Sequence, residues 1–305
     1  MNHFLTTENL DRETLSGLLD EADGFAEVLT RPIPKVPALR GKTVATMFFE
    51  PSTRTRMSFE KAAKALSADT VSFSPGISAL SKGESLKDTV LTIRAMGVDL
   101  MVVRHKATGV AWRLAEWLDI PVINGGDGAH QHPTQALLDC QTIRQRFGTL
   151  AGLHIAIVGD IKHSRVARSN VFAMTTLGAE VTLVGPPTLL PVDVESWPVN
   201  TTSDLDGILG STDVVYLLRV QTERGGASVF PSFSEYAERF GMSMARMNSL
   251  KSEAIVLHPG PMNRGVEISH DVADSDRALI LDQVANGVAT RMAVLFRLLE
   301  GDHDA

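Results

Sequence analysis

The chain has 305 residues, of which 44% are hydrophobic and 21% are charged, and its formal net charge is −7. This length can bury a large core and favours about two domains, while the negative charge argues against general nucleic-acid binding, which needs a basic surface. The single cysteine, Cys140, excludes an intrachain disulfide and a cysteine-based zinc site. We expect a cytoplasmic protein without a membrane partner, because the sequence has no signal-peptide pattern and no run of roughly 18 apolar residues.

Strand-like apolar runs alternate with helical patterns through the first half of the chain. Apolar residues at helical spacing from Leu15 to Leu29 predict an amphipathic helix, and prolines from Pro32 to Pro37 predict a short extended loop after it. The strands expected next are Thr43–Phe49, Thr70–Phe73, Asp99–Arg104 and Pro121–Asn124.

The alternation resumes after a helix that begins near Pro133. The strands expected in this half are His154–Val158, Glu180–Val184, Asp213–Leu218 and Ala254–Leu257. The polar segment Gln221–Ser234 predicts a mobile loop near the strand ends, and a last helix is expected roughly from Asp282 to Leu299.

Short, nearly continuous apolar strands that alternate with helices predict parallel sheets covered on both faces. We therefore predict an α/β fold with two doubly wound parallel-sheet domains, residues 1–132 and residues 133–282. The helix that begins near Pro133 would link them.

The string from Phe48 to Glu60 predicts an anion site at the start of a helix. An apolar run ends at Pro51, a segment rich in hydroxyl groups follows, and apolar residues then recur at helical spacing. Ser52 or Thr53 is therefore placed to cap the helix. The N-terminus of a helix offers backbone N–H groups and the positive end of the macrodipole, which together attract anions.

Two arginines in this string make a phosphate cradle the favoured interpretation. Arg54 and Arg56 lie two residues apart, so on a helix they project to nearly opposite sides. We assign Arg54 to the helix mouth and expect Arg56 to brace the structure. The alternative is a simple cap followed by solvated arginines.

Further polar residues follow the other predicted strands. These segments are Arg104-His105, Gly125–Gly128, Gly159–Arg165, Arg219–Gln221 and His258–Gly265. In open parallel sheets, ligands bind outside the carboxyl ends of the strands. Arginines at positions 54, 104, 165 and 219, each on a different element, therefore indicate anionic ligands.

The string from His132 to Gln135 predicts a second helix mouth. Pro133 suits the first helical position, which places His132 at the cap and Gln135 in the first turn, with both side chains reaching the same mouth. The positive helix end favours a neutral imidazole that could donate a hydrogen bond to a carbonyl oxygen. The alternative is that His132 serves only as the cap.

Together these strings resemble the aspartate and ornithine carbamoyltransferase family, over essentially the whole chain and in particular the catalytic chains of its aspartate branch. The matching strings are Phe49–Glu60, Ser78–Glu84, Val103–His105, Gly126–Gln135, Gly159–Arg168, Leu218–Arg224 and His258–Ile268. The resemblance implies transfer of the carbamoyl group of carbamoyl phosphate to the amino group of L-aspartate, in pyrimidine biosynthesis, without a metal or cofactor. It also implies that residues 1–132 bind carbamoyl phosphate, that residues 133–282 bind aspartate, and that the C-terminal helix, 283–305, packs back on the first domain.

Carried over residue by residue, the resemblance implies a set of groups around carbamoyl phosphate. Those that would hold its phosphate are Ser52, Thr53, Arg54, Thr55 and Arg104. Those that would face its carbonyl oxygen are Arg54, Thr55 and His132, and those that would hold its amide are Gln135, Gly260 and Pro261. Many relatives have a larger residue than Gly260 between the two prolines of this loop; a backbone contact would survive that change, in a more flexible loop.

The resemblance also implies a site shared between subunits. Aspartate would be bound by Arg165, Arg219 and Gln221. Ser78 and Lys82 would enter the site of a neighbouring subunit, where Lys82 would also contact aspartate and act in catalysis. A homotrimer would then be the minimal active unit. Trimers of this family work alone, pair with regulatory chains or associate with a dihydroorotase, and nothing in the sequence selects among these.

Two other functions compete with this interpretation. Ornithine carbamoyltransferases have a cysteine after the histidine of the His258 loop, where this chain has Pro259, and Cys140 lies elsewhere. A non-catalytic phosphate-binding regulator could share the fold, since fold alone does not fix function. Such a regulator would be expected to lack some of the groups that stabilise a transition state, whereas this chain has them all.

Overall fold

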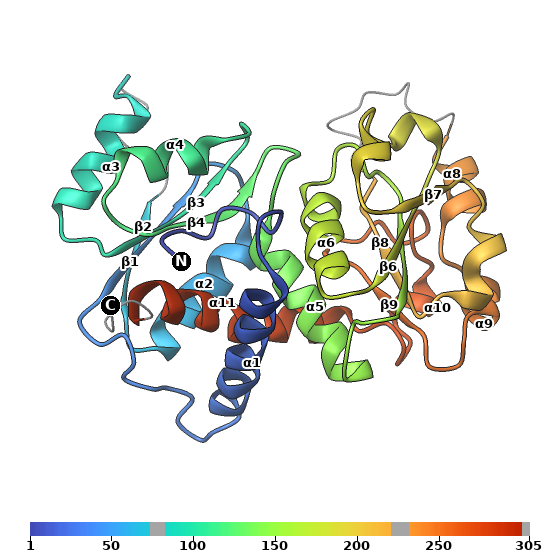
Figure 1. The fold of residues 1–305 in the computed structure, drawn as a ribbon, viewed down its shortest axis with the longest axis horizontal. Coiled ribbons are helices and arrows are strands. Elements are labelled where there is room, and N and C mark those ends of the chain that lie inside the picture. The colour runs from blue at the N-terminus through green and yellow to red at the C-terminus, as the bar shows by residue number, and fades with distance from the viewer. Residues whose placement is uncertain (74–82, 221–231, 301–305) are drawn as a thin grey trace. The chain divides into compact units, whose positions relative to one another are not determined.

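The structure, a computed structural model, describes residues 1–73, 83–220 and 232–300. The chain divides into two units, one made of Met1–Gln141 with Val284–Ala305 and the other of Thr142–Gln283 (Figure 1). The division falls inside helix α5 (Pro133–Phe147), later than the predicted boundary after residue 132. No helix in the described parts of the chain is both long and apolar enough to cross a membrane.

The first unit contains a four-stranded parallel sheet in the order β2-β1-β3-β4. Its strands are β1 (Thr43–Phe48), β2 (Asp69–Phe73), β3 (Leu100–His105) and β4 (Val122–Asp127). All four predicted strands are therefore present. Strand β4 continues past its predicted end at Asn124, because Asp127 still pairs with His105 of β3 beyond an irregularity in the register. The apolar runs of β1 and β3 are buried, as strands covered on both faces should be.

Helices cover both faces of this sheet. They are α1 (Arg12–Leu29), α2 (Thr53–Ala65), α3 (Leu86–Ala95) and α4 (Val110–Trp117), followed by α5. One cluster of buried residues joins α3 and α4 to the strand residues Met47 and Val103. Helix α2 packs on β1 and β2 from the opposite side, with its predicted apolar residue Phe59 fully buried (Figure 1).

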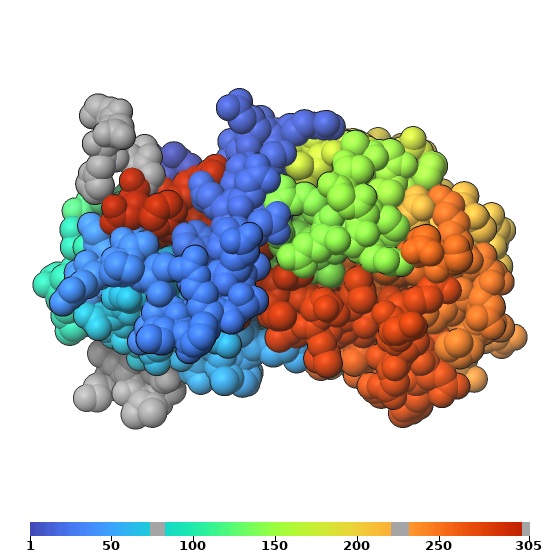
Figure 2. All heavy atoms as spheres, turned by 90° about the horizontal axis from the view of Figure 1, so that it is seen from below, coloured from blue at the N-terminus to red at the C-terminus, as the bar shows by residue number. Residues whose placement is uncertain are grey.

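The last helix, α11 (Ile280–Glu300), returns to the first unit. The Nε atom of Arg297 donates to Glu21 Oε1 of α1 at 2.9 Å. The rings of Phe25 and Phe296 meet edge to face, with centroids 5.7 Å apart. Atoms of α1 and α11 lie side by side on the surface in Figure 2 (dark blue and red). The prediction that the C-terminal helix packs on the first domain is confirmed.

The second unit contains a five-stranded parallel sheet in the order β7-β6-β5-β8-β9. Its strands are β5 (His154–Val158), β6 (Glu180–Val184), β7 (Asn200–Thr202), β8 (Val214–Leu217) and β9 (Ile255–Leu257). The predicted bounds of β5 and β6 are those observed. Strand β7 was not predicted, because it consists of three polar residues at the sheet edge and carries no apolar run.

In the described part of this unit, the helices beside the sheet are α6 (Arg165–Thr176), α8 (Phe233–Phe240), α9 (Met244–Ser249) and α10 (His270–Ala273), with short 3-10 turns at Pro187–Leu189, Val194–Ser196 and Asp206–Ser211. Most of the predicted loop Gln221–Ser234 lies outside the described residues, but its last part is helical. The Ser232 side chain caps α8 by accepting from the backbone N–H of Glu235 at 3.1 Å. Serine with glutamate three residues later is a helix-start pattern that the prediction overlooked.

Candidate active site

Each sheet has one point at which the order of the strands reverses. In the first unit β1 pairs with β3, and in the second β5 pairs with β8. The segments that leave such neighbours turn away from each other, so a crevice opens at their carboxyl ends, where open α/β sheets bind ligands. Most of the predicted site residues follow these four strands.

The first turn of α2 follows β1. Ser52 occupies the N-cap position, and its carbonyl oxygen accepts from the backbone N–H of Arg56 at 3.3 Å. Its side chain makes no capping hydrogen bond, so the capping role expected for its hydroxyl is wrong. Thr53 and Arg54 are exposed, whereas Thr55 is buried. The helix start therefore presents one guanidinium and one hydroxyl to solvent.

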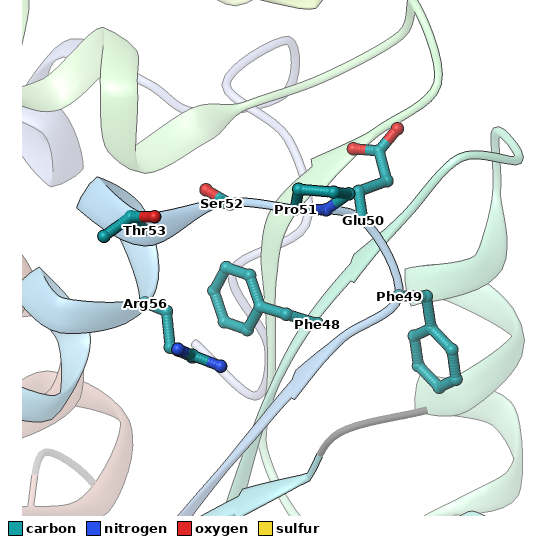
Figure 3. A pocket seen from close by; sticks show the side chains of 7 residues that line it. All are labelled: Phe48, Phe49, Glu50, Pro51, Ser52, Thr53 and Arg56. Carbon is teal, nitrogen blue, oxygen red and sulfur yellow. The ribbon is translucent and has the colours of Figure 1, made fainter. Parts of the chain in front are cut away.

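A pocket of about 350 Å³ opens beside this helix start (Figure 3). Its lining residues are Phe48, Phe49, Glu50, Pro51, Ser52, Thr53 and Arg56. The Arg56 side chain extends from α2 past the ring of Phe48. Its Nε also lies 3.9 Å from Glu60 Oε1, as expected for a bracing residue, but it lines the pocket as well.

Arg104, at the end of β3, joins the two sides of the first crevice. Its Nη1 donates to Thr55 Oγ1 at 3.4 Å and to the Gly125 carbonyl oxygen at 3.5 Å. Its Nε donates to Glu50 Oε2 at 3.2 Å, and both side chains of this ion pair are only about 15% exposed. The structure thus brings Thr55 and Arg104 together. The role of Glu50 was missed, although it lies inside the most informative string of the sequence.

The turn between β4 and α5 is organised by a buried carboxylate. Asp127 accepts hydrogen bonds from the backbone of Gly109 at 2.7 Å, from Asn124 Nδ2 at 2.8 Å and from the backbone of Gln131 at 3.0 Å. The carbonyl oxygen of the next residue, His132, accepts from the backbone N–H of Gln135 at 2.9 Å. His132 therefore has the N-cap position predicted from Pro133, and its side chain is buried.

Gln135 makes a contact that the sequence did not indicate. Its Nε2 donates to Asp139 Oδ1, one turn further along α5, at 3.0 Å. Both side chains are buried. The prediction placed the Gln135 side chain at the helix mouth with His132, whereas its amide nitrogen is held along the helix.

The crevice of the second unit lies between β5 and β8. Gly159 follows β5 with φ +129°, and a Cβ there would lie 2.8 Å from Tyr236 Oη and 3.1 Å from the Leu218 carbonyl oxygen, so only glycine fits this close approach. Arg165 begins α6 and is buried, while Arg219 follows β8 and is partly buried. Two predicted aspartate-binding arginines therefore flank this crevice.

The loop after β9 is held by a buried histidine. The backbone N–H of Gly260 donates to His258 Nδ1 at 2.8 Å, so Nδ1 must be an acceptor and Nε2 must carry the proton. That Nε2 donates to Glu267 Oε1 at 3.2 Å, and both side chains are fully buried. The pair fixes the backbone that leads through a cis peptide into Pro261. Glu267 was not singled out in the sequence.

Three predicted site residues, Ser78, Lys82 and Gln221, lie outside the described residues. Within the described ranges, no group of three or more histidine, cysteine, aspartate or glutamate side chains is arranged to hold a metal ion.

A half-buried histidine lies beside the first crevice. His105 Nδ1 accepts from the backbone N–H of Ala107 at 2.9 Å, and its ring meets Phe49 edge-on at 5.2 Å. Burial lowers the pKa of the His105 imidazole, and this effect outweighs the opposing charge of Glu50. The ring is therefore neutral at physiological pH.

Two family models match the chain. Residues 2–145 match the aspartate/ornithine carbamoyltransferase, carbamoyl-P binding domain, and residues 151–298 match the aspartate/ornithine carbamoyltransferase, Asp/Orn binding domain. The chain therefore belongs to the aspartate/ornithine carbamoyltransferase family.

Within this family the chain is similar to aspartate carbamoyltransferase catalytic subunits. The one from Thermobifida fusca is 57% identical over 99% of this chain and 96% of its own length. The one from Acidothermus cellulolyticus is 58% identical over 100% of this chain and 94% of its own length. Aspartate transcarbamoylase from Trypanosoma cruzi, in a crystal structure with carbamoyl phosphate and aspartate, is 29% identical with a TM-score of 0.89, over 98% of this chain and 97% of that chain. Its complex with N-(phosphonacetyl)-L-aspartic acid gives 30% identity and the same TM-score, over 98% of this chain and 96% of that chain.

We expect the melting temperature to fall as the pH is lowered from about 7 to about 5, because burial lowers the pKa values of His105 and His3. The unfolded chain then binds protons first, so stability present above the ordinary histidine pKa of about 6.5 is lost as the pH falls toward the folded values. His105→Asn keeps an acceptor for the Ala107 N–H but cannot take up this proton. Thermal melts of the variant should show a smaller decline than the wild type, with the remainder due to His3. Equal declines would contradict this assignment.

Proposed function

We propose that this chain is the catalytic chain of an aspartate carbamoyltransferase, which transfers the carbamoyl group of carbamoyl phosphate to L-aspartate and releases N-carbamoyl-L-aspartate and phosphate. One observation carries the proposal. Thr55 and Arg104 meet at the crevice of the unit that matches the carbamoyl-P binding domain, and Arg165 and Arg219 flank the crevice of the other unit. The pyrimidine pathway and a cytoplasmic location are parts of the same proposal.

The chemistry suits these residue types. The amine nitrogen of aspartate attacks the carbamoyl carbon, the bond from that carbon to the phosphate oxygen breaks, and one proton passes from the nitrogen to the departing phosphate. Negative charge develops on the carbonyl oxygen and on the departing phosphate. Such a reaction needs positioning and preorganised positive dipoles and requires no protein nucleophile.

Most of the groups proposed for carbamoyl phosphate lie at the end of β3 and at the starts of α2 and α5 in the first unit, and the others follow β9 in the second unit. Ser52, Thr53, Arg54, Thr55 and Arg104 would bind the phosphate. Arg54, Thr55 and His132 would stabilise the developing oxyanion, because each can direct an N–H or O–H group at it. Gln135 and the backbone at Gly260 and Pro261 would hold the carbamoyl amide.

The groups proposed for aspartate are cationic or amide side chains. Arg165 and Arg219 would each grip a carboxylate, for which a planar guanidinium is well shaped. Gln221 and Lys82 complete this set.

Ornithine is disfavoured as the second substrate. A cationic side chain would be repelled by Arg165 and Arg219, whereas the carboxylates of aspartate are attracted. Cys140, the one cysteine of the chain, is fully buried on α5 and cannot replace the cysteine of the ornithine enzymes in the His258 loop. A non-catalytic regulator is also disfavoured, because the oxyanion-directed groups are retained together.

We further propose that the active unit is a homotrimer in which Ser78 and Lys82 act in the neighbouring subunit. An exposed apolar edge of the first unit supports this. Strand β2 is an edge strand whose Val71 is 46% exposed, and Met57 of the adjacent helix α2 is 59% exposed. Unpaired strand edges and exposed apolar side chains are surfaces that another chain can cover.

A product assay tests the proposed function directly. The purified chain is incubated with carbamoyl phosphate and either aspartate or ornithine, and carbamoyl-aspartate and citrulline are measured. Carbamoyl-aspartate alone supports the proposal, and citrulline would favour the ornithine reaction. Phosphate binding without either product would favour a regulator.

Arg54→Ala should lower kcat by about 10²–10³-fold, the usual effect of losing one oxyanion-directed donor. Its guanidinium is exposed at the helix start, so the melting temperature should change little. Lys61→Ala removes another exposed cation of α2 and is the matched control, with kcat near the wild-type value. A loss below about tenfold in the Arg54 variant would reject the assignment.

Mixing two inactive variants tests the shared site. Lys82→Ala and Arg54→Ala chains should each be nearly inactive, but should regain activity when they are unfolded together and reassembled. Some interfaces of a mixed trimer would pair an intact Arg54 with an intact Lys82 of the neighbour. If mixed trimers form and no activity returns, each chain builds its own site.

A further inference from the structure

A buried pair of opposite charges lies behind the first crevice and has no role in the function proposed above. Asp139 of α5 is completely buried, and Arg291 of α11 is 3% exposed. Asp139 accepts from Gln135 Nε2 at 3.0 Å. Arg291 Nη1 donates to Ser58 Oγ of α2 at 2.9 Å, and the guanidinium lies over the Phe59 ring, 5.1 Å from its centroid.

Burying the charge of this arginine is unfavourable, and the fold has to make room for its side chain. Burial lowers the pKa of Arg291 to about 10, and the negative charge of Asp139 opposes that shift, so the guanidinium remains charged at neutral pH. Gly287 lies inside α11, where glycine weakens a helix. A Cβ at this position would lie 2.5 Å from Arg291 Nη1, so the glycine makes room for the guanidinium. A buried charge retained in this way needs a partner and points to a specific role.

The chemistry of Asp139 fixes the direction of the Gln135 amide. In the hydrogen bond between them, Gln135 turns its NH₂ group toward Asp139 Oδ1 and its Oε1 away. The negative charge of Asp139 partly offsets the lowering of the Arg291 pKa by burial, so the two side chains interact electrostatically. An oxygen that points away from Asp139 can accept a hydrogen bond from an amide N–H of a ligand.

We propose that Asp139 is a positioning residue that presents Gln135 Oε1 as the acceptor for the NH₂ group of carbamoyl phosphate. The proposal rests on the proposed function, because it names the ligand group that Gln135 receives. Asp139 holds Gln135 in the first turn of α5, while Arg291 contacts Ser58, one turn after Arg54 on α2.

The test is a double-mutant cycle on Asp139 and Gln135. In Asp139→Asn the new amide can donate as well as accept, so Gln135 is no longer held in one orientation. This variant should bind carbamoyl phosphate at least about fivefold more weakly, the effect of one hydrogen bond, with an unchanged KM for aspartate. Gln135→Ala should show a loss of its own, and adding Asp139→Asn to it should cause no further loss beyond about twofold.

Glu21→Gln is the structural control, because it breaks another contact of α11, with Arg297, away from the crevice. It should lower the melting temperature without weakening carbamoyl phosphate binding. If Asp139→Asn does not fold, Asp139→Ser replaces it in the same cycle, because its smaller side chain carries a hydroxyl that can donate as well as accept.

The outcomes distinguish a failure of the proposed function from a failure of the role proposed for Asp139. Wild-type chain that forms no carbamoyl-aspartate overturns the proposed function and this inference with it. If the wild type is active but the losses of carbamoyl phosphate binding in the two single variants multiply in the double variant, the inference alone is overturned. It is also overturned if Asp139→Asn binds carbamoyl phosphate as well as the wild type does. If Glu21→Gln weakens carbamoyl phosphate binding as much as Asp139→Asn does, α11 acts only as a general support. That result would also overturn the inference.

Discussion

The rest of this structure depends on one constraint. Strands that are not consecutive in the chain pair with each other, in parallel, at the centre of each sheet. Because β1 lies beside β3, the helix start after β1 and the arginine at the end of β3 share one edge of the sheet. The Thr55–Arg104 hydrogen bond joins two segments that are remote in sequence. The β5–β8 pairing does the same for the segments that carry Arg165 and Arg219. The strand order thus determines where each crevice lies, and the side chains beside it belong to the segments that leave these strands.

Carboxylates hold the polar groups of the first unit in place before any ligand arrives. Glu50 holds Arg104, Asp127 holds the turn before α5, and Asp139 holds Gln135. Groups that are fixed in advance need little reorganisation when charge develops in a transition state, which is the main source of electrostatic catalysis. The same carboxylates offset the positive charge that several buried or half-buried cations would otherwise concentrate there.

The sequence predicted the elements of this fold well where its apolar runs were continuous. The bounds of β5 and β6 were those observed, and α11 was expected on the first domain. Strand β7 escaped prediction because pairing at the sheet edge, and not burial, makes Asn200–Thr202 a strand. The start of α8 was missed because its Ser232 cap stood within a polar segment.

The site was predicted residue by residue from motifs, but its supporting partners were not. A motif can place Arg104 at a strand end, yet which carboxylate meets it depends on contacts between elements far apart in the chain. Glu50, Asp139 and Glu267 therefore emerged only from the structure. The Ser52 hydroxyl shows the opposite error. Ser52 occupies the N-cap position of α2, but its side chain makes no capping hydrogen bond. The roles of all the site residues stay predictions, and Ser78, Lys82 and Gln221 lie outside the described residues.

The central claim is that the two crevices serve different substrates, and calorimetric titration of carbamoyl phosphate in the absence of aspartate tests it most directly. Arg104→Ala should weaken this binding at least about tenfold, because charge-assisted hydrogen bonds to the phosphate are lost. Arg219→Ala should leave it within about twofold of the wild type while raising the KM for aspartate. Equal weakening of carbamoyl phosphate binding in both variants would contradict the account.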